Sequence, residues 1–225
     1  MTTSQITLSS FVDLKACLHG SLCTETNAFA YVGKALGVWV ESLLDELGVG
    51  DKPKILGDVS PGAYLQGRVY IAEDAIVEPT AFIQGPCYIG PGAEVRHGAY
   101  IRGQVYIGTK AVVGHTTEVK GSMFFDHAKA GHFAYVGDSI LGRDTNLGAG
   151  TKLANLPLRR SIIKVKDPTT DQWISTELQK FGAIMGDKAQ TGCNAVLSPG
   201  TLLLPGTAVL PCVHFRGTLR QGFAR

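Results

Sequence analysis

The chain has 225 residues with a net charge of +2, and hydrophobic residues make up 44% of it against 18% charged residues. This composition excludes a disordered chain and provides no strong field for nucleic acid. There is no apolar run of the ~18 residues that a membrane helix needs. The polar first ten residues lack a secretory signal, and five cysteines without a CxxC pair indicate free thiols in a cytoplasmic protein. The 28 glycines, about 12% of the chain, suggest many tight turns.

Residues 1–50 are predicted to form a helical N-terminal segment. Between Asn27 and Leu47 the apolar residues recur at helical spacing. Thr24 or Thr26 is a candidate N-cap, and Gly48 is expected to end the helix. We expect this segment to cover an open end of the strands predicted below, whose edges are otherwise unpaired. The alternative is packing elsewhere on the surface or on a partner subunit.

Residues 51–225 are predicted to form one all-β domain, because a six-residue repeat follows. In ten consecutive hexads the fifth position is aliphatic, and the third is Ala, Val or Cys in the first nine. A helix or an isolated strand would show a period near four or two instead. Three short strands joined by three corners make a coil of eighteen residues, which is typical of a parallel β-helix. The aliphatic positions are Leu65, Ile71, Val77, Ile83, Ile89, Val95, Ile101, Ile107, Val113 and Val119.

The repeat is interrupted twice before it resumes near residue 185. First, the spacing changes between residues 124 and 153, with one step of five instead of six from Val136 to Leu141. Second, residues 155–180 contain no hexad and are rich in proline and charge, so they are predicted to form one long inserted loop. Loops of this length in compact domains are usually functional or mobile. The second series of hexads is Met185, Thr191, Leu197, Leu203 and Val209.

The interrupted region carries a specific motif. Residues 129–138 read KAGHFAYVGD, and residues 146–151 read NLGAGT. This resembles the acetyltransferase domain of GlmU, the bifunctional glucosamine-1-phosphate acetyltransferase/N-acetylglucosamine-1-phosphate uridyltransferase of the hexapeptide-repeat superfamily, which carries K-A-G-H-x-x-Y-x-G-D and N-x-G-A-G-T at the same separation. The similarity runs without gaps from about residue 79 to 156 and resumes near residue 180. It implies a left-handed β-helix and a homotrimer with sites between neighbouring subunits.

The resemblance also implies acetyl transfer from acetyl-CoA to the amine of an amino-sugar phosphate, without a metal. His132 stands at the position of the catalytic base, and histidine suits that task at neutral pH. Glu118 stands at the acidic residue that supports this histidine. Arg102 and Lys120 match cations around the sugar phosphate. Tyr135, Asn146 and Asn155 match further positions at the sugar. Ala149 matches a position at the acetyl-CoA end, and Lys180 and Cys193 are assigned to that end by their place in the alignment.

The spacing groups some of these residues without reference to any family. Arg102 and Lys120 are eighteen residues apart, so they are expected to lie one above the other on the same face. Lys120 and Asp138 repeat that step. Arg102 and Lys120 could also be ordinary solvated surface charges, and His132 could be a turn histidine.

Several departures from the family pattern concern the donor end. Leu156 replaces a tyrosine, Cys193 replaces a serine, and Pro211, which has no N–H, stands where the family has a backbone donor. The uridyltransferase motif L-x-x-G-x-G-T-x-M is not found, so we expect acetyl transfer without the uridyltransferase domain. The alternative hypothesis is a non-catalytic sugar-nucleotide binding or assembly module that partners a separate nucleotidyltransferase.

A third hypothesis is a metal lyase of the γ-carbonic anhydrase type, which shares the β-helix. His127 and His132 have the H-x4-H spacing of two zinc ligands, and His97 and His115 are eighteen residues apart. The other signature residues of that family are not evident. Cys17, His19 and Cys23 match no standard zinc spacing. No metal site is therefore predicted.

Overall fold

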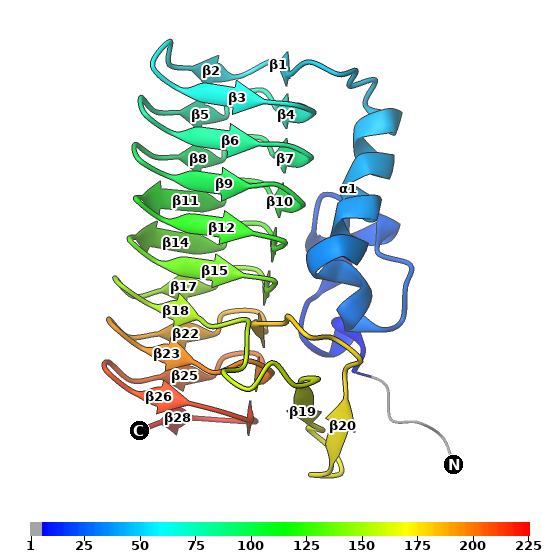
Figure 1. The fold of residues 1–225 in the computed structure, drawn as a ribbon, viewed down its shortest axis with the longest axis vertical. Coiled ribbons are helices and arrows are strands. Elements are labelled where there is room, and N and C mark those ends of the chain that lie inside the picture. The colour runs from blue at the N-terminus through cyan, green and yellow to red at the C-terminus, as the bar shows by residue number, and fades with distance from the viewer. Residues whose placement is uncertain (1–5) are drawn as a thin grey trace.

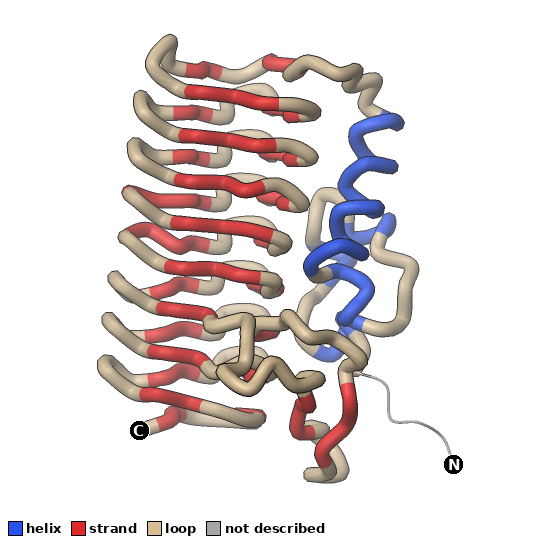
Figure 2. The backbone as a smooth tube through the Cα atoms, in the orientation of Figure 1, coloured by secondary structure: helices blue, strands red, loops and turns tan. Residues whose placement is uncertain are grey.

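The chain forms a left-handed parallel β-helix flanked by an N-terminal helical segment, as the computed structural model of residues 6–225 shows (Figure 1). Residues 1–5, and with them part of the stretch in which no secretory signal was predicted, lie outside the described residues. Three sheets of short strands form the sides of the β-helix (Figure 2). Each complete coil contributes one strand to each sheet, so the predicted fold class is confirmed.

We name the sheets in the order in which the chain reaches them. The first sheet contains β1 (Lys54–Ile55), β4 (Val69–Ile71), β7 (Cys87–Ile89), β10 (Val105–Ile107), β13 (Met123–Phe124), β16 (Ile140–Leu141), β21 (Ala183–Met185), β24 (Thr201–Leu203) and β27 (Thr218–Leu219). The second sheet contains β2 (Asp58–Val59), β5 (Ile76–Val77), β8 (Glu94–Val95), β11 (Val112–His115), β14 (Lys129–His132), β17 (Asn146–Leu147), β22 (Gln190–Thr191), β25 (Ala208–Val209) and β28 (Phe223–Ala224). The third sheet contains β3 (Tyr64–Gln66), β6 (Phe82–Gln84), β9 (Tyr100–Arg102), β12 (Glu118–Lys120), β15 (Tyr135–Gly137), β18 (Lys152–Leu153), β23 (Val196–Leu197) and β26 (His214–Phe215).

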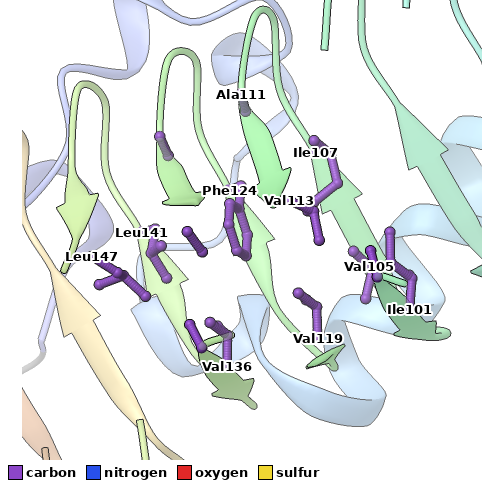
Figure 3. Close-up of a cluster of buried hydrophobic side chains, with 14 of the residues drawn as sticks. Ile101, Val105, Ile107, Ala111, Val113, Val119, Phe124, Val136, Leu141 and Leu147 are labelled. Atoms are coloured by element: carbon purple, nitrogen blue, oxygen red, sulfur yellow. The ribbon is translucent and has the colours of Figure 1, made fainter. Parts of the chain in front are cut away.

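The aliphatic positions of the hexads fill the interior of the coil. Ile101, Val119 and Val136 are register neighbours on successive strands of the third sheet, and each is fully buried. Figure 3 shows these side chains facing Ile107 and Phe124 of the first sheet across the interior. Because burial of one such side chain contributes ~1.5–3 kcal/mol, the stacked columns stabilise the β-helix along its whole length.

Two coils are one residue shorter than the repeat predicts. Strand β12 pairs with β15 so that Lys120 lies opposite Gly137, a step of seventeen residues. The shortening falls at the corner between the third and first sheets, from Val119 to Phe124 and again from Val136 to Leu141. Asp138 therefore occupies the corner and is not the strand neighbour of Lys120 that the eighteen-residue spacing predicted.

The N-terminal segment is helical but more divided than predicted. It contains the 3₁₀ turns η1 (Leu8–Ser10), η2 (Leu14–Ala16), η3 (Gly20–Leu22) and η4 (Ala28–Tyr31), and the helix α1 (Gly33–Glu46). The prediction of Thr24 or Thr26 as N-cap is wrong, since the Asn27 side chain caps η4 and extended Val32 precedes α1. Gly48 follows the helix with φ +66°, which confirms the predicted end.

The N-terminal segment lies along the outer face of the first sheet, and the prediction that it covers an open end is wrong (Figure 1). Leu36 and Val40 of α1 pack in one buried cluster with Tyr106 and Met123 of the first sheet. The outward side chains of this sheet are apolar, so they need a cover along their length. The alternative, packing elsewhere on the surface, is the one observed.

The inserted loop contains an antiparallel hairpin. Its strands are β19 (Lys164–Lys166) and β20 (Trp173–Ser175). Ile163 and Val165 join the same buried cluster as α1, so the hairpin continues the cover of the first sheet towards the C-terminal coils. Outward side chains of the second and third sheets remain exposed, among them Ile76, Tyr64 and Tyr100. No helix within residues 6–225 has the length and apolar character to cross a bilayer.

Candidate functional site

Four of the predicted site residues line one groove on the outer face of the second sheet. His132 ends β14, Asn146 begins β17, and Ala149 and Cys193 lie in the corners that follow β17 and β22. The groove has a volume of about 660 Å³. The β-helix thus brings the predicted base together with two of the residues predicted for the acetyl-CoA end.

His132 is exposed at the corner between the second and third sheets. Its backbone is held by its register with His115 and by the Gly150 N–H, which donates to the His132 carbonyl at 3.1 Å. Adjacent Gly131 leaves the groove beside the imidazole open, because a Cβ at that position would meet no atom within 4 Å. A ligand can therefore approach the imidazole from the groove.

Arg102 and Glu118 form a pair on the third sheet. The Arg102 Nη1 donates to the Glu118 Oε1 at 2.7 Å, and the guanidinium lies 5.7 Å from the Tyr100 ring centroid. The hydrogen bond with Glu118 raises the pKa of Arg102. Among residues 6–225, no recorded hydrogen bond joins Glu118 to His132, so the supporting role of Glu118 stays a prediction.

A second polar group occupies the corner between the third and first sheets. The Lys120 Nζ donates to both carboxylate oxygens of Asp138, at 2.9 and 3.1 Å. The Asn155 amide also donates to Asp138, and its carbonyl oxygen accepts from the Tyr135 hydroxyl at 3.2 Å. Burial is the main cause that raises the pKa of Tyr135, and the Glu118 and Asp138 carboxylates add to it. The structure therefore joins three predicted substrate residues through Asp138, to which the sequence assigned no role.

Asp138 is the central residue of this group, since its side chain is only 3% exposed. It is part of the KAGHFAYVGD motif and follows a shortened coil, which are the two signals that could have identified it. Its neighbours include the N-terminal segment, because the Gly33 N–H donates to the Gly121 carbonyl at 2.9 Å beside the carboxylate. The corner thus connects the candidate site to the cover of the first sheet.

A second groove lies between the inserted loop and the third sheet, with a volume of about 920 Å³. Its lining is largely apolar and includes Leu156, Ile162 and Trp173, with Arg216 over the Trp173 ring at 5.4 Å. Leu156 is the residue that replaces the family tyrosine, so this departure belongs to the second groove. Lys180 is exposed at the end of the inserted loop and lines neither groove.

The histidines of the metal hypothesis lie along the second sheet. His127 precedes β14 and His132 ends it, so their backbones lie at opposite ends of one strand. The rings of His97 and His115 contact each other in a tilted arrangement with centroids 4.3 Å apart, and the His97 Nδ1 lies 3.3 Å from the Glu78 Oε2. Across residues 6–225 there is no group of three or more His, Cys, Asp or Glu side chains that could hold a metal ion.

These features define a hexapeptide-repeat β-helix with a polar groove beside an exposed histidine. Residues 83–209, more than half of the chain, match the GMPPB C-terminal domain family, and the chain belongs to this family. Similarity to curated proteins places it in the same class, and the resemblance to the GlmU acetyltransferase domain is confirmed.

The chain covers less than half the length of each of the following relatives. The chain is 37% identical over 145 residues to a bifunctional sugar-1-phosphate nucleotidylyltransferase/acetyltransferase of Sulfurisphaera tokodaii, covering 64% of this chain and 36% of that protein. It is 37% identical over 79 residues to the bifunctional protein GlmU of Methanococcus vannielii, covering 35% of this chain and 18% of that protein. It is 28% identical over 95 residues to the putative uncharacterized acetyltransferase YaiX of Escherichia coli, covering 42% and 40%. The similarity supports a domain of the sugar-phosphate acetyltransferase type.

Proposed function

We propose that the chain transfers an acetyl group from acetyl-CoA to the amine of an amino-sugar phosphate of the glucosamine-1-phosphate type. The observation that carries this proposal is the single groove lined by His132, Asn146, Ala149 and Cys193. It joins the predicted base with residues predicted for the acceptor and for the donor. Free thiols at all five cysteines agree with a cytoplasmic location for the reaction.

The chemistry requires one base. The acceptor nitrogen attacks the thioester carbonyl, and a neutral His132 takes the proton that the nitrogen loses. The carbon–sulfur bond then breaks, CoA leaves as a thiol, and the proton held by His132 can return to the sulfur. An imidazole suits both steps because its ordinary pKa lies near neutrality. No metal is needed for this transfer.

The proposed site is completed by a second copy of the chain. The groove lies on the second sheet, whereas the other predicted site residues lie on or beside the third sheet. These residues are Arg102, Glu118, Lys120, Tyr135 and Asn155. In the homotrimer we propose, the third sheet of one subunit faces the groove of its neighbour. Lys180, exposed at the end of the inserted loop, would then reach the neighbouring site.

The test is a thiol-release assay with acetyl-CoA and several amino-sugar phosphates, glucosamine-1-phosphate first. We expect His132→Ala to lower kcat by about 10²–10⁴-fold, the usual contribution of a positioned base. His97→Ala is the matched control, since His97 is exposed along the same sheet and is not assigned to the chemistry. A near-normal kcat in His132→Ala would show that His132 is not the base.

A second candidate function is a non-catalytic sugar-nucleotide binding or assembly module that partners a nucleotidyltransferase. The departures from the family pattern favour it, since Leu156 lines the apolar second groove instead of the groove beside His132, and the Pro211 ring packs against Gly192. Calorimetry with acetyl-CoA separates the two functions. Heat of binding supports the transferase, and no binding at millimolar acetyl-CoA supports the module.

A further inference from the structure

The groove on the second sheet has one cationic half. Arg96, Lys110 and Lys129 line the part that lies on the N-terminal side of His132. The other half is lined by Asn146, Ala149 and Cys193, which carry no formal positive charge. The acidic residue of the lining, Glu94, is bonded to Arg96 at 2.7 Å.

The two lysines lie on adjacent coils. Lys110 occupies the corner before β11, and Lys129 begins β14, where it is the register partner of Val112. Lys110 is displaced from Lys129 by one strand spacing of ~4.8 Å and by two residues of ~3.3 Å each along the strand. Flexible lysine side chains span this separation, so both ammonium groups can reach one phosphate or diphosphate. Both side chains are exposed, and the ion pairs recorded for residues 6–225 include neither of them.

Arg102 and Lys120, which the sequence predicted to bind the sugar phosphate, are each paired with a carboxylate. Arg102 is bonded to Glu118, and Lys120 is bonded to the buried carboxylate of Asp138. A ligand phosphate at either cation would have to compete with a carboxylate that already neutralises it. At Lys110 and Lys129 a phosphate would meet uncompensated charge, which makes this half of the groove the better anion site.

We propose that Lys110 and Lys129 bind the phosphate-bearing end of the ligand and direct its reacting end towards His132. The inference rests on the proposed function only for the identity of the ligand. Two sources share this chemistry, the phosphate of the acceptor sugar and the phosphates of the acyl donor. In both cases Gly131 is the open backbone that the ligand crosses between the lysines and His132.

Binding of glucosamine-1-phosphate, glucosamine, CoA and pantetheine to the full chain tests the proposal without turnover. In calorimetry we expect Lys110→Gln and Lys129→Gln each to raise the Kd for one phosphate-bearing ligand about tenfold or more, because each variant loses one charge-assisted hydrogen bond. Lys188→Gln is the matched control. Lys188 is exposed at the same corner position with φ +61°, against +52° for Lys110, and it does not line the groove.

The arms of the experiment identify the source. A loss confined to glucosamine-1-phosphate assigns the acceptor phosphate, and a loss confined to CoA assigns the donor. Glucosamine and pantetheine, which carry no phosphate, should bind both variants as tightly as they bind the wild type. Unchanged affinity for both phosphate ligands, equal loss in Lys188→Gln, or no binding by the wild-type chain at millimolar ligand would overturn the proposal.

Gly131→Ala gives a second test that does not change charge. Apart from its two chain neighbours, the added Cβ meets no protein atom within 4 Å, and the φ of Gly131 is outside the left-handed region, so the melting temperature should stay unchanged. The methyl group should still raise the Kd of the ligand about tenfold or more, because it occupies part of the groove. Gly50→Ala, whose Cβ would also meet nothing within 4 Å, is the control and should bind normally.

These outcomes are separable from those of the proposed function. If His132→Ala keeps its kcat while Lys110→Gln and Lys129→Gln lose phosphate-dependent affinity, the anion site stands and the assignment of the base fails. If His132→Ala loses activity while the two lysine variants bind normally, the base stands and the anion site fails.

Discussion

Asp138 is the residue around which the polar corner of the β-helix is organised. Its carboxylate accepts from Lys120 and Asn155, and Asn155 in turn accepts from Tyr135. These bonds fix the side chains that the family resemblance assigned to the sugar. Asp138 is therefore best described as a positioning residue, since it acts through the groups it holds.

Replacement of Asp138 should destabilise the chain. Asp138→Asn keeps the shape and tolerates the φ of +46°, but it leaves Lys120 without its counter-charge. Loss of one partner from a buried pair costs ~3–5 kcal/mol, and because the Lys120 side chain is 21% exposed we expect about 2–3 kcal/mol in denaturant unfolding. Asp144→Asn, at an exposed corner with φ +54°, should have little effect. Equal stability of the two variants would show that the ion pair does not matter.

The motif identified His132 as the candidate base, and the structure places it in a groove, but a motif does not report which partners its members bind. Glu118 was expected to support His132, and its recorded partner is Arg102. Charge pairing depends on which side chains the corners bring close, and a change of one residue in a coil alters that. The eighteen-residue spacing of Arg102 and Lys120 predicted that they lie on one face, and the register of β9 and β12 confirms it.

The N-terminal segment is attached to the first sheet through contacts that include a titratable group. The Tyr106 hydroxyl lies 3.1 Å from the His19 Nδ1, and the His19 ring contacts the Tyr88 ring edge-on. Burial lowers the pKa of His19, although the nearby Asp126 carboxylate acts in the opposite direction. The folded chain therefore favours the neutral imidazole.

This pKa shift predicts a loss of stability in mild acid. Below the ordinary pKa of histidine, about 6.5, the unfolded chain binds a proton that the folded chain takes up only at lower pH. The stability that the neutral His19 side chain contributes at neutral pH is therefore lost as the pH falls from about 7 towards 5. The melting temperature of the wild type should fall more over this range than that of His19→Asn. A parallel fall in both proteins would exclude His19 as the cause.

Elements differ in how well their own residues determine them. Gly48 follows the end of the helix as predicted, because the residue type at that position alone favours the left-handed conformation that ends a helix. The break between η4 and α1 was not predicted, since it coincides with the bond from Gly33 to Gly121, more than eighty residues away in the chain. The apolar periodicity of residues 27–47 spans both elements and does not reveal the interruption.

Within residues 6–225, the second and third sheets expose many of their outward side chains. The first sheet is covered by the N-terminal segment and the hairpin, whereas the third sheet carries a ladder of aromatic rings, Tyr64, Phe82 and Tyr100, with neighbouring centroids 5.0 and 5.5 Å apart. Tyr64 and Tyr100 are 56% and 41% exposed. Such a ladder is a suitable contact surface for a neighbouring subunit of the proposed homotrimer.

Light scattering after gel filtration should therefore give three times the chain mass of 23.9 kDa. Replacing both outer rings, Tyr64→Lys with Tyr100→Lys, should reduce the mass towards that of the single chain. Val38→Lys is the control, because Val38 is 71% exposed on α1, away from the third sheet. A wild-type mass of one chain, or dissociation by Val38→Lys, would contradict the proposed assembly.

The sequence by itself determined the β-helix, because every hexad specifies its own strand, inward side chain and corner, and ten consecutive hexads agree. It also determined the motif that contains His132. Tertiary structure alone decided where the N-terminal segment lies, since the outward apolar residues of the first sheet, such as Tyr106 and Met123, occupy positions that the repeat leaves free. It also decided the partners of Lys120 and Arg102. Burial and ion pairing depend on contacts between residues on different coils, and a six-residue pattern records only the strand to which each residue belongs.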